Sequence, residues 1–279
     1  MTINENIITG RTQLGALMLV AVMATATSLP VVAETYDVVI NNGRVMDPET
    51  NFDDVRNVGV KDGKIVAITK DAIKGKETID AKGHVVAPGF IEGHQHATDQ
   101  FSRKVNLRDG LTTQMDFEAG AGDIAKWYAG AEGKTQSNYG MVVLATLARA
   151  SVLDGPEIAA SGNEMGELFR SVVPGAAAKA QKEGRKPGWS STLPNKEEMT
   201  KILSYVDEGL RQGALGVGIP VGYMTTGVTS YELYKYQELA AKYGRISNGH
   251  VRFAGIRPPT EGALGIQEML SNAMVLDAP

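Results

Sequence analysis

Beyond residue 96, segments with the residue pattern of a β-strand alternate with segments that have helical spacing. The strand patterns cover residues 112–118, 139–147, 214–219 and 245–250. Apolar residues recur at helical spacing over residues 195–211, and Thr229 with Glu232 forms a capping box for a helix that ends before Gly244. Strands that alternate with helices predict a parallel sheet covered by helices. We therefore expect an α/β fold.

Composition excludes some functional classes before any motif is considered. Hydrophobic residues make up 43% of the chain and charged residues 22%, which is ordinary for a folded globular protein. The formal net charge of -4 gives no electrostatic case for nucleic acid, so we expect no nucleic-acid partner. Cysteine is absent, and this excludes disulfides, thiolate metal ligands and a cysteine nucleophile.

Residues 1–33 have the pattern of a signal peptide. A polar start that contains Arg11 precedes an uncharged apolar stretch over residues 14–26, and small residues suit cleavage between Ala33 and Glu34. A retained transmembrane anchor is the competing interpretation, but the uncharged core is shorter than the roughly 20 residues that a spanning helix needs. We expect an exported protein, periplasmic or secreted, without stable membrane association after cleavage.

Residues 34–87 are expected to form a small β-sandwich segment ahead of the α/β part, residues 88–279. Its strand-like runs cover residues 36–40, 58–60, 65–68 and 77–80. Asp62-Gly63 between two of these runs is a strong hairpin signal. The first run is expected to end at the Asn-Asn-Gly of residues 41–43, and His84 is expected to be structural.

Two of the four histidines of the chain, His94 and His96, stand two residues apart. In a strand, residues two apart project to the same side, and two imidazoles placed in this way can bind one metal ion. A chance pair of surface or strand-end histidines is the alternative. An apolar run over residues 85–91 leads into the pair, as expected of a buried barrel strand that delivers ligands at its C-terminal end.

Two further residues extend this candidate site. Alternation along residues 112–118 sets Gln114, Asp116 and Glu118 on one face, and a buried carboxylate needs a partner or a metal. Glu118 is therefore a candidate ligand or bridge, although it could instead cap a loop or pair with Lys or Arg. His250 ends the last predicted strand and places a third imidazole at the same end of the sheet.

Residues 155–191 show little periodicity and include a basic segment. A stretch of this length between barrel elements is either a lid or a solvated excursion. We expect the excursion.

The motif around the histidine pair resembles a known family. Residues 86–91 read Val-Ala-Pro-Gly-Phe-Ile and are followed by the acidic Glu92 and by His94-Gln95-His96. This is similar to the amidohydrolase superfamily of metal-dependent hydrolases. Within it, residues 213–223 and 249–252 resemble the D-aminoacylase group, the N-acyl-D-amino-acid and N-acyl-D-glutamate deacylases.

The resemblance implies a TIM-type (β/α)8 hydrolase barrel, of which this chain carries about five strands, and one or two Zn²⁺ ions. His94 and His96 would bind one metal, His250 would bind a second or shared metal, Tyr223 would polarise the substrate carbonyl and Arg252 would face the substrate carboxylate. The small-molecule substrate would be an N-acyl-D-amino acid, such as N-acyl-D-glutamate. Its hydrolysis would yield a carboxylic acid and a D-amino acid.

The chain also departs from the family pattern. The D-aminoacylases carry a metal-bridging cysteine on the second strand, whereas this chain has Glu118 at about that place. Glu92 stands where Asp is usual, and residues 144–146 replace a Gly-His element. Other open possibilities are a superfamily enzyme that acts on a cyclic amide or deaminates a base, and a non-catalytic protein.

The length suggests an incomplete barrel. About 190 residues remain after residue 87, whereas an eight-stranded barrel takes roughly 250. We expect residues 272–279 to approach a sixth strand, and a fourth histidine and the general-base Asp to lie beyond Pro279. An inactive truncated fragment, with weak metal binding and little turnover, is therefore a further expectation. The oligomeric state is left open.

Overall fold

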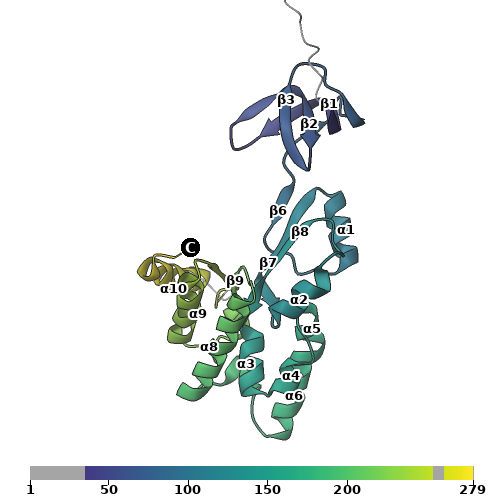
Figure 1. Ribbon diagram of the computed structural model, residues 1–279. Helices are drawn as coiled ribbons and strands as arrows, with labels where there is room; N and C mark the ends of the chain where they lie inside the picture. The colour runs from purple at the N-terminus through teal and green to yellow at the C-terminus, as the bar shows by residue number, and fades with distance from the viewer. Residues whose placement is uncertain (1–34, 254–260, 279) are drawn as a thin grey trace, which may run out of the picture. The chain divides into compact units, whose positions relative to one another are not determined.

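The computed structural model describes residues 35–253 and 261–278, so the expected signal peptide lies outside the described residues. Contacts divide the chain into two compact units, Met1–Ala87 and Pro88–Pro279 (Figure 1). Among the described helices, none is long and apolar enough to cross a bilayer.

The first unit contains a five-stranded mixed sheet. Its strands are β1 (Tyr36–Asp47), β2 (Phe52–Lys61), β3 (Lys64–Thr69), β4 (Gly75–Asp80) and β5 (Val85–Val86). The order is β3-β2-β1-β4, with β5 also beside β1; β2 runs antiparallel to β1, and β4 and β5 run parallel to it. The described strands of this unit therefore form one mixed sheet. Apolar side chains such as Ile65 and Ile68 are correspondingly exposed.

Turn chemistry explains the shape of this sheet. Asp62 and Gly63 both have positive φ, 50° and 72°, as the tight turn between β2 and β3 requires, so the predicted hairpin is confirmed. The expected strand end at residues 41–43 is wrong. Strand β1 continues through this point because its register shifts in a bulge, where Asn42 adopts a φ of 60° and its N–H is bound by the Asn57 side chain.

The second unit is built on a parallel five-stranded sheet. Its strands are β6 (Phe90–Glu92), β7 (Leu111–Ala121), β8 (Asn138–Leu144), β9 (Gly216–Gly218) and β10 (Ile246–Asn248). They lie side by side in chain order, and every adjacent pair is parallel. Consecutive parallel strands connected through helices are the repeating topology of a (β/α)8 barrel. The sheet is thus a half-barrel: its parallel strands confirm the prediction from the strand and helix alternation, and its topology agrees with the barrel that the family resemblance implies.

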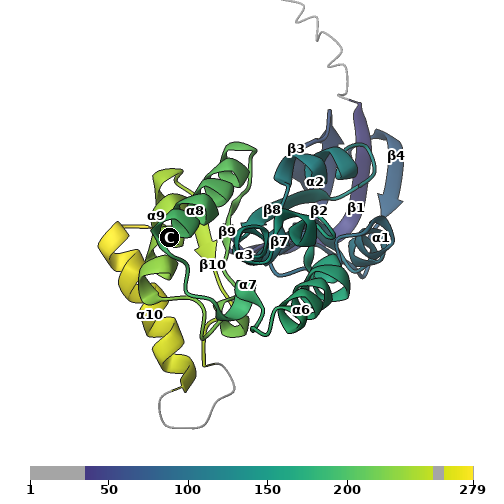
Figure 2. The ribbon, with the colours of Figure 1, turned by 90° about the horizontal axis from the view of Figure 1, so that it is seen from below.

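Helices connect these strands. They are α1 (Gln100–Arg108), α2 (Ile124–Ala131), α3 (Ala145–Leu153), α4 (Pro156–Ala159), α5 (Met165–Glu167), the π-helix η1 (Leu168–Val172), α6 (Val173–Lys182), α7 (Gly188–Ser191), α8 (Lys196–Arg211), the 3₁₀ turn η2 (Val221–Tyr223), α9 (Ser230–Lys242) and α10 (Glu261–Leu276). Figure 2 shows α8 and α9 beside β9 and β10, with α10 next to α9. Buried residues of α8, such as Ile202 and Val206, join Val143 and Val217 of the strands in one core. The helical spacing of residues 195–211 is thereby confirmed.

The apolar run of residues 85–91 does not form one buried strand. Val85–Val86 belongs to the first unit as β5, whereas Phe90–Glu92 opens the second sheet as β6. Pro88 interrupts the run because proline has no backbone N–H to give to a ladder. Phe90 and Ile91 are 67% and 70% exposed, because β6 is the edge strand of the described sheet.

Two other apolar stretches form helices rather than strands. Strand β8 ends at Leu144, and residues 145–147 start α3 instead of completing a strand. Residues 272–276 belong to α10 rather than to the approach to a sixth strand. Short apolar runs fit a buried strand and a buried helix equally well, so their pattern alone does not distinguish the two.

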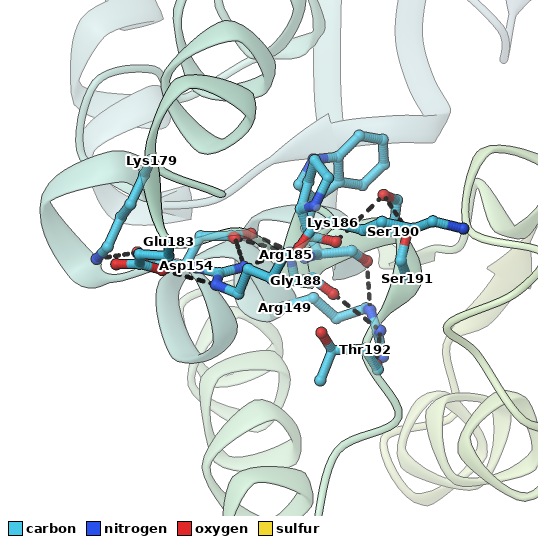
Figure 3. Close-up of polar contacts among 12 residues, drawn as sticks. Arg149, Asp154, Lys179, Glu183, Arg185, Lys186, Gly188, Ser190, Ser191 and Thr192 are labelled. Atoms are coloured by element: carbon cyan, nitrogen blue, oxygen red, sulfur yellow. Dashed lines mark hydrogen bonds and ion pairs between the residues drawn. The ribbon is translucent and has the colours of Figure 1, made fainter. Parts of the chain in front are cut away.

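Residues 155–191 are helical and anchored, so the expectation of a solvated excursion is wrong. Arg149 of α3 is fully buried and donates hydrogen bonds to the backbone oxygens of Trp189 and Thr192, both at 2.6 Å. Asp154 accepts from the backbone N–H groups of Gly188 and Trp189 at 2.7 and 2.8 Å. Figure 3 shows Arg149 and Asp154 pointing at the same α7 segment. Buried polar side chains thus hold α7 against α3.

Candidate metal centre

Three histidines surround one glutamate at the C-terminal ends of the strands. His94 and His96 follow β6, Glu118 lies on β7 and His250 follows β10. The Nε2 atoms of His94 and His96 lie 2.8 and 3.0 Å from Oε2 of Glu118, and Nδ1 of His250 lies 3.1 Å from its Oε1. The structure therefore brings together all four residues that the sequence singles out as candidate ligands.

The donor set fits a divalent cation. Ligand atoms of His94, His96 and Glu118 all lie within 4.8 Å of one another. The two Nε2 atoms are 3.1 Å apart, and Zn–N bonds of ~2.0–2.1 Å in tetrahedral geometry would separate two nitrogens by about 3.3 Å. Oε1 of Glu118 is buried and has no hydrogen bond among the described residues, although His250 is close. A buried anionic oxygen in this state favours a bound cation.

Asp116 sets the orientation of His96. Its Oδ2 lies 2.9 Å from Nδ1 of His96, and its Oδ1 accepts from the backbone N–H groups of Glu118 and Ala119. A proton held on Nδ1 by this carboxylate leaves the Nε2 lone pair free to bind a metal ion between His96 and Glu118. Asp116 was not predicted as a functional residue, although it stands in the same row of inward-facing side chains as Glu118.

Alternation along β7 explains how that row arises. Gln114, Asp116 and Glu118 are buried, whereas the intervening Met115 and Phe117 are only partly buried. The predicted face is therefore confirmed. On the neighbouring segment, the Glu92 side chain accepts from the His94 backbone N–H at 2.7 Å and fixes the start of the histidine loop.

Tyr223 lies against the cluster. Its ring centroid is 4.7 Å from that of His250, and the side chain is 44% exposed. The preceding residue must be glycine, because a Cβ on Gly222 would lie 2.4 Å from Cδ2 of His250. The N–H of Gly222 donates to the His250 backbone oxygen at 2.7 Å. The η2 turn thus brings a phenol and an imidazole together.

Arg252 is engaged elsewhere. Its guanidinium donates to the Glu268 carboxylate of α10 at 2.7 Å and to the Val228 backbone oxygen at 3.0 Å. The residue is 8% exposed. In this structure the side chain expected to face a substrate carboxylate instead joins α10 to the loop before α9.

Comparison with known proteins shows which enzymes this chain resembles in sequence and in fold. No family model matches the chain. A stretch of 83 residues, 29% of the chain, is 52% identical to a dihydroorotase of Streptococcus pneumoniae serotype 4 and covers 18% of that protein. The solved N-acyl-D-glutamate deacylase of Bordetella bronchiseptica, complexed with zinc and a phosphonate inhibitor, aligns with a TM-score of 0.65 at 20% identity over 88% of this chain and 50% of that one. A D-hydantoinase structure aligns with a TM-score of 0.55 at 19% identity over 87% and 50%.

The solved structures agree on the fold. The half-barrel and the N-terminal mixed sheet have the fold of solved amidohydrolase TIM-barrel structures. The chain is thus similar in fold to these enzymes and, over a short stretch, similar in sequence to a dihydroorotase. It spans about half the length of the solved structures and a smaller share of the dihydroorotase.

Proposed function

We propose that the His94, His96, Glu118 and His250 cluster binds zinc, as one or two ions, and that this centre serves the hydrolysis of a carbon–nitrogen bond in an amide. The observation that carries the proposal is the buried Glu118 carboxylate, which three imidazole nitrogens approach within 3.1 Å and whose Oε1 has no hydrogen bond among the described residues. Bound zinc would supply Lewis-acid polarisation of a carbonyl and would lower the pKa of a water molecule.

The surrounding residues have distinct roles in this proposal. His94 and His96 would hold one ion, Glu118 and His250 would complete the ligand set, and Asp116 keeps the proton of His96 on Nδ1. The Tyr223 phenol donates a hydrogen bond to the carbonyl oxygen as negative charge develops there.

The proposed substrate is a linear amide, an N-acyl-D-amino acid such as N-acyl-D-glutamate. The deacylase structure, with its TM-score of 0.65 against 0.55 for the D-hydantoinase, supports this choice, as does Tyr223 beside His250. The second candidate is a cyclic amide, which the 52% identity to a dihydroorotase favours. We further propose that the protein is exported after cleavage at Ala33, and that its partner is a small molecule rather than a nucleic acid or a membrane.

Zinc binding tests the centre directly. Equilibrium dialysis of the purified chain against zinc, with the metal counted by mass spectrometry, is expected to show binding that the H94A/H96A double variant weakens at least 100-fold. His84→Ala is the matched control, because His84 lies in the first unit, where its Nδ1 is 3.2 Å from the Lys82 backbone oxygen, and is not one of the proposed ligands. Less than a tenth of an equivalent of zinc on the wild-type chain at saturation would contradict the proposal.

Product analysis separates the substrates. The zinc-loaded chain is incubated with N-acetyl-D-glutamate, with hydantoin and with adenine, and released amine, opened ring or released ammonia is measured. Release of D-glutamate supports the linear amide, and faster ring opening of hydantoin supports the second candidate. Zinc binding without turnover of any of the three would favour a non-catalytic role for this chain.

A further inference from the structure

A cavity lies next in sequence to the segments that carry the metal centre. It has a volume of about 370 Å³ and is lined by residues 98–100 and Arg103 at the start of α1, by one face of α2, and by Asn163, Glu164 and Glu167. Both helices lie on the same side of β7 and β8 (Figure 1). The cavity borders both loops that carry the cluster. Its wall residue Thr98 follows His96 by two positions. The backbone of Glu164, another wall residue, pairs in an isolated β-bridge with Ala121, which follows Glu118 by three positions.

Arg103 is the unusual residue of this cavity. It is only 5% exposed, and its guanidinium lies 5.0 Å from the centre of the Trp127 ring and 5.3 Å from that of Tyr139. Its guanidinium makes no hydrogen bond or ion pair with any residue in the described ranges. Burial lowers the pKa of Arg103, which indicates that the charged form lacks full compensation. A buried charge of this kind is costly unless an anion accompanies it.

The acidic residues of the cavity do not supply that anion by direct contact. Asp99 accepts from the N–H groups of Phe101 and Ser102 and so caps α1. Glu164 accepts hydrogen bonds from the Thr98 hydroxyl and from Nε1 of Trp127. Its charge favours the charged form of Arg103 without direct contact. The carboxylates thus have their own donors. Lys126 adds a second cation to the wall, with no ion pair among the described residues.

We propose that this cavity is a carboxylate-binding site in which the Arg103 guanidinium, stacked on Trp127, binds the carboxylate group of a small ligand. A planar guanidinium presents paired N–H donors that match the two oxygens of a carboxylate. The aromatic faces hold that plane in a fixed orientation and leave its edge for the ligand. The site therefore supplies the carboxylate recognition that Arg252 cannot give while it is paired with Glu268.

The choice of ligand rests on the proposed function, because both the substrate and the amino-acid product of that reaction carry a carboxylate. The shared chemistry is the carboxylate itself, and its source is either the N-acylated amino acid or the free amino acid. A free amino acid would also place its ammonium group near Glu164 and Glu167, which line the same cavity.

Tryptophan fluorescence reports on this site without any need for turnover. The chain has two tryptophans, so Trp189→Phe leaves Trp127 as the single reporter. Nε1 of Trp189 has no hydrogen-bond partner among the described residues, so this change removes no such bond. In this background the protein, stripped of metal with EDTA, is titrated with N-acetylglycine, with glycine and with N-acetylglycinamide, which lacks the carboxylate.

We expect saturable binding of N-acetylglycine or glycine and none of the amide. The tighter of the two carboxylates identifies the source. Arg103→Met should weaken binding about 10-fold or more, as expected for hydrogen bonds to a charged group. Lys104→Met is the matched control, since Lys104 is an exposed cation on the same helix outside the cavity wall. Arg103→Lys keeps the charge without the planar fork and should weaken binding less; it provides the test if the Met variant does not fold.

Equal binding of the amide, equal binding by the Arg103 and Lys104 variants, or no fluorescence response to either carboxylate would overturn the inference. None of these outcomes depends on zinc. The proposed hydrolysis can therefore fail while the carboxylate site stands, and the reverse also holds.

Discussion

At the residue scale, the candidate centre depends on what each buried carboxylate contacts. Asp116 is satisfied by two backbone N–H groups and by His96, whereas Glu118 is surrounded by imidazole nitrogens and keeps one oxygen without a hydrogen bond among the described residues. The two residues stand two apart on one strand and face the same way. Their different partners give them different roles: one orients a histidine, and the other is placed to bind metal.

Asp116→Asn tests this division of roles. The amide cannot hold the Nδ1 proton of His96 as a carboxylate does, so the preferred orientation and basicity of Nε2 are lost. Zinc affinity should fall about 10- to 100-fold, as is typical for partners of metal-bound histidines. Equilibrium dialysis measures the change. Asp109→Asn makes the same chemical substitution at an exposed position and should leave zinc affinity unaltered; an unchanged affinity in the Asp116 variant would refute the role.

At the element scale, buried ion pairs join helices that are distant in the chain. Arg149 of α3 binds Glu232 of α9 at 2.6 Å, and both side chains are fully buried. The Tyr236 hydroxyl donates to the same carboxylate, and burial together with the Glu232 charge raises the pKa of Tyr236 well above its usual value. The predicted capping box of α9 is thus half realised. Thr229 caps the helix, but the Glu232 side chain is directed into the core.

Arg149→Met should destabilise the chain by about 3–5 kcal/mol, because it leaves the Glu232 carboxylate buried without its cation. The R149M/E232Q double variant should recover part of this loss, since the stranded charge is removed. Urea unfolding followed by circular dichroism gives the free energies of unfolding. Lys201→Met removes an exposed pair with Glu197 and should cost about 0.3–0.5 kcal/mol. A decrease in the free energy of unfolding below about 1 kcal/mol for Arg149→Met would show that the ion pair with Glu232 does not stabilise the fold.

At the scale of the whole molecule, the two units differ in what zinc can do for them. The proposed ligands all belong to the second unit, Pro88–Pro279. Among the described residues of the first unit, no three His, Asp or Glu side chains lie close enough together to hold a metal ion. A ligand that binds only the folded form stabilises it by mass action, by ~2.7 kcal/mol at 100 times Kd. Zinc should therefore protect the half-barrel alone.

Hydrogen–deuterium exchange, read by mass spectrometry with and without zinc, measures this selectivity. Exchange should slow in peptides of β7, β9 and β10 after zinc addition, whereas peptides of β1 and β2 should exchange at the same rate. EDTA should reverse the effect. Equal slowing in both units would mean that zinc acts nonspecifically, and the assigned centre would then be wrong.

Residue spacing along the sequence correctly predicted several features of this protein, although the short apolar runs were ambiguous between strand and helix. The alternation of strands and helices predicts the parallel sheet, Asp62-Gly63 predicts the hairpin, and the period of β7 predicts that Glu118 faces inward. These features depend on backbone geometry within a few residues, which sequence spacing encodes directly. The two-residue spacing of His94 and His96 is encoded in the sequence in the same way.

Contacts between distant segments were decided by the tertiary structure. Arg252 pairs with Glu268, and Arg103 lies buried between Trp127 and Tyr139, because their partners come from other elements. The helices of residues 155–191 likewise depend on Arg149 and Asp154 from outside that stretch. Spacing along the chain fixes which way a side chain points from its own element. Which group it then meets is fixed only when the elements pack, because burial and pairing free energies arise from that contact.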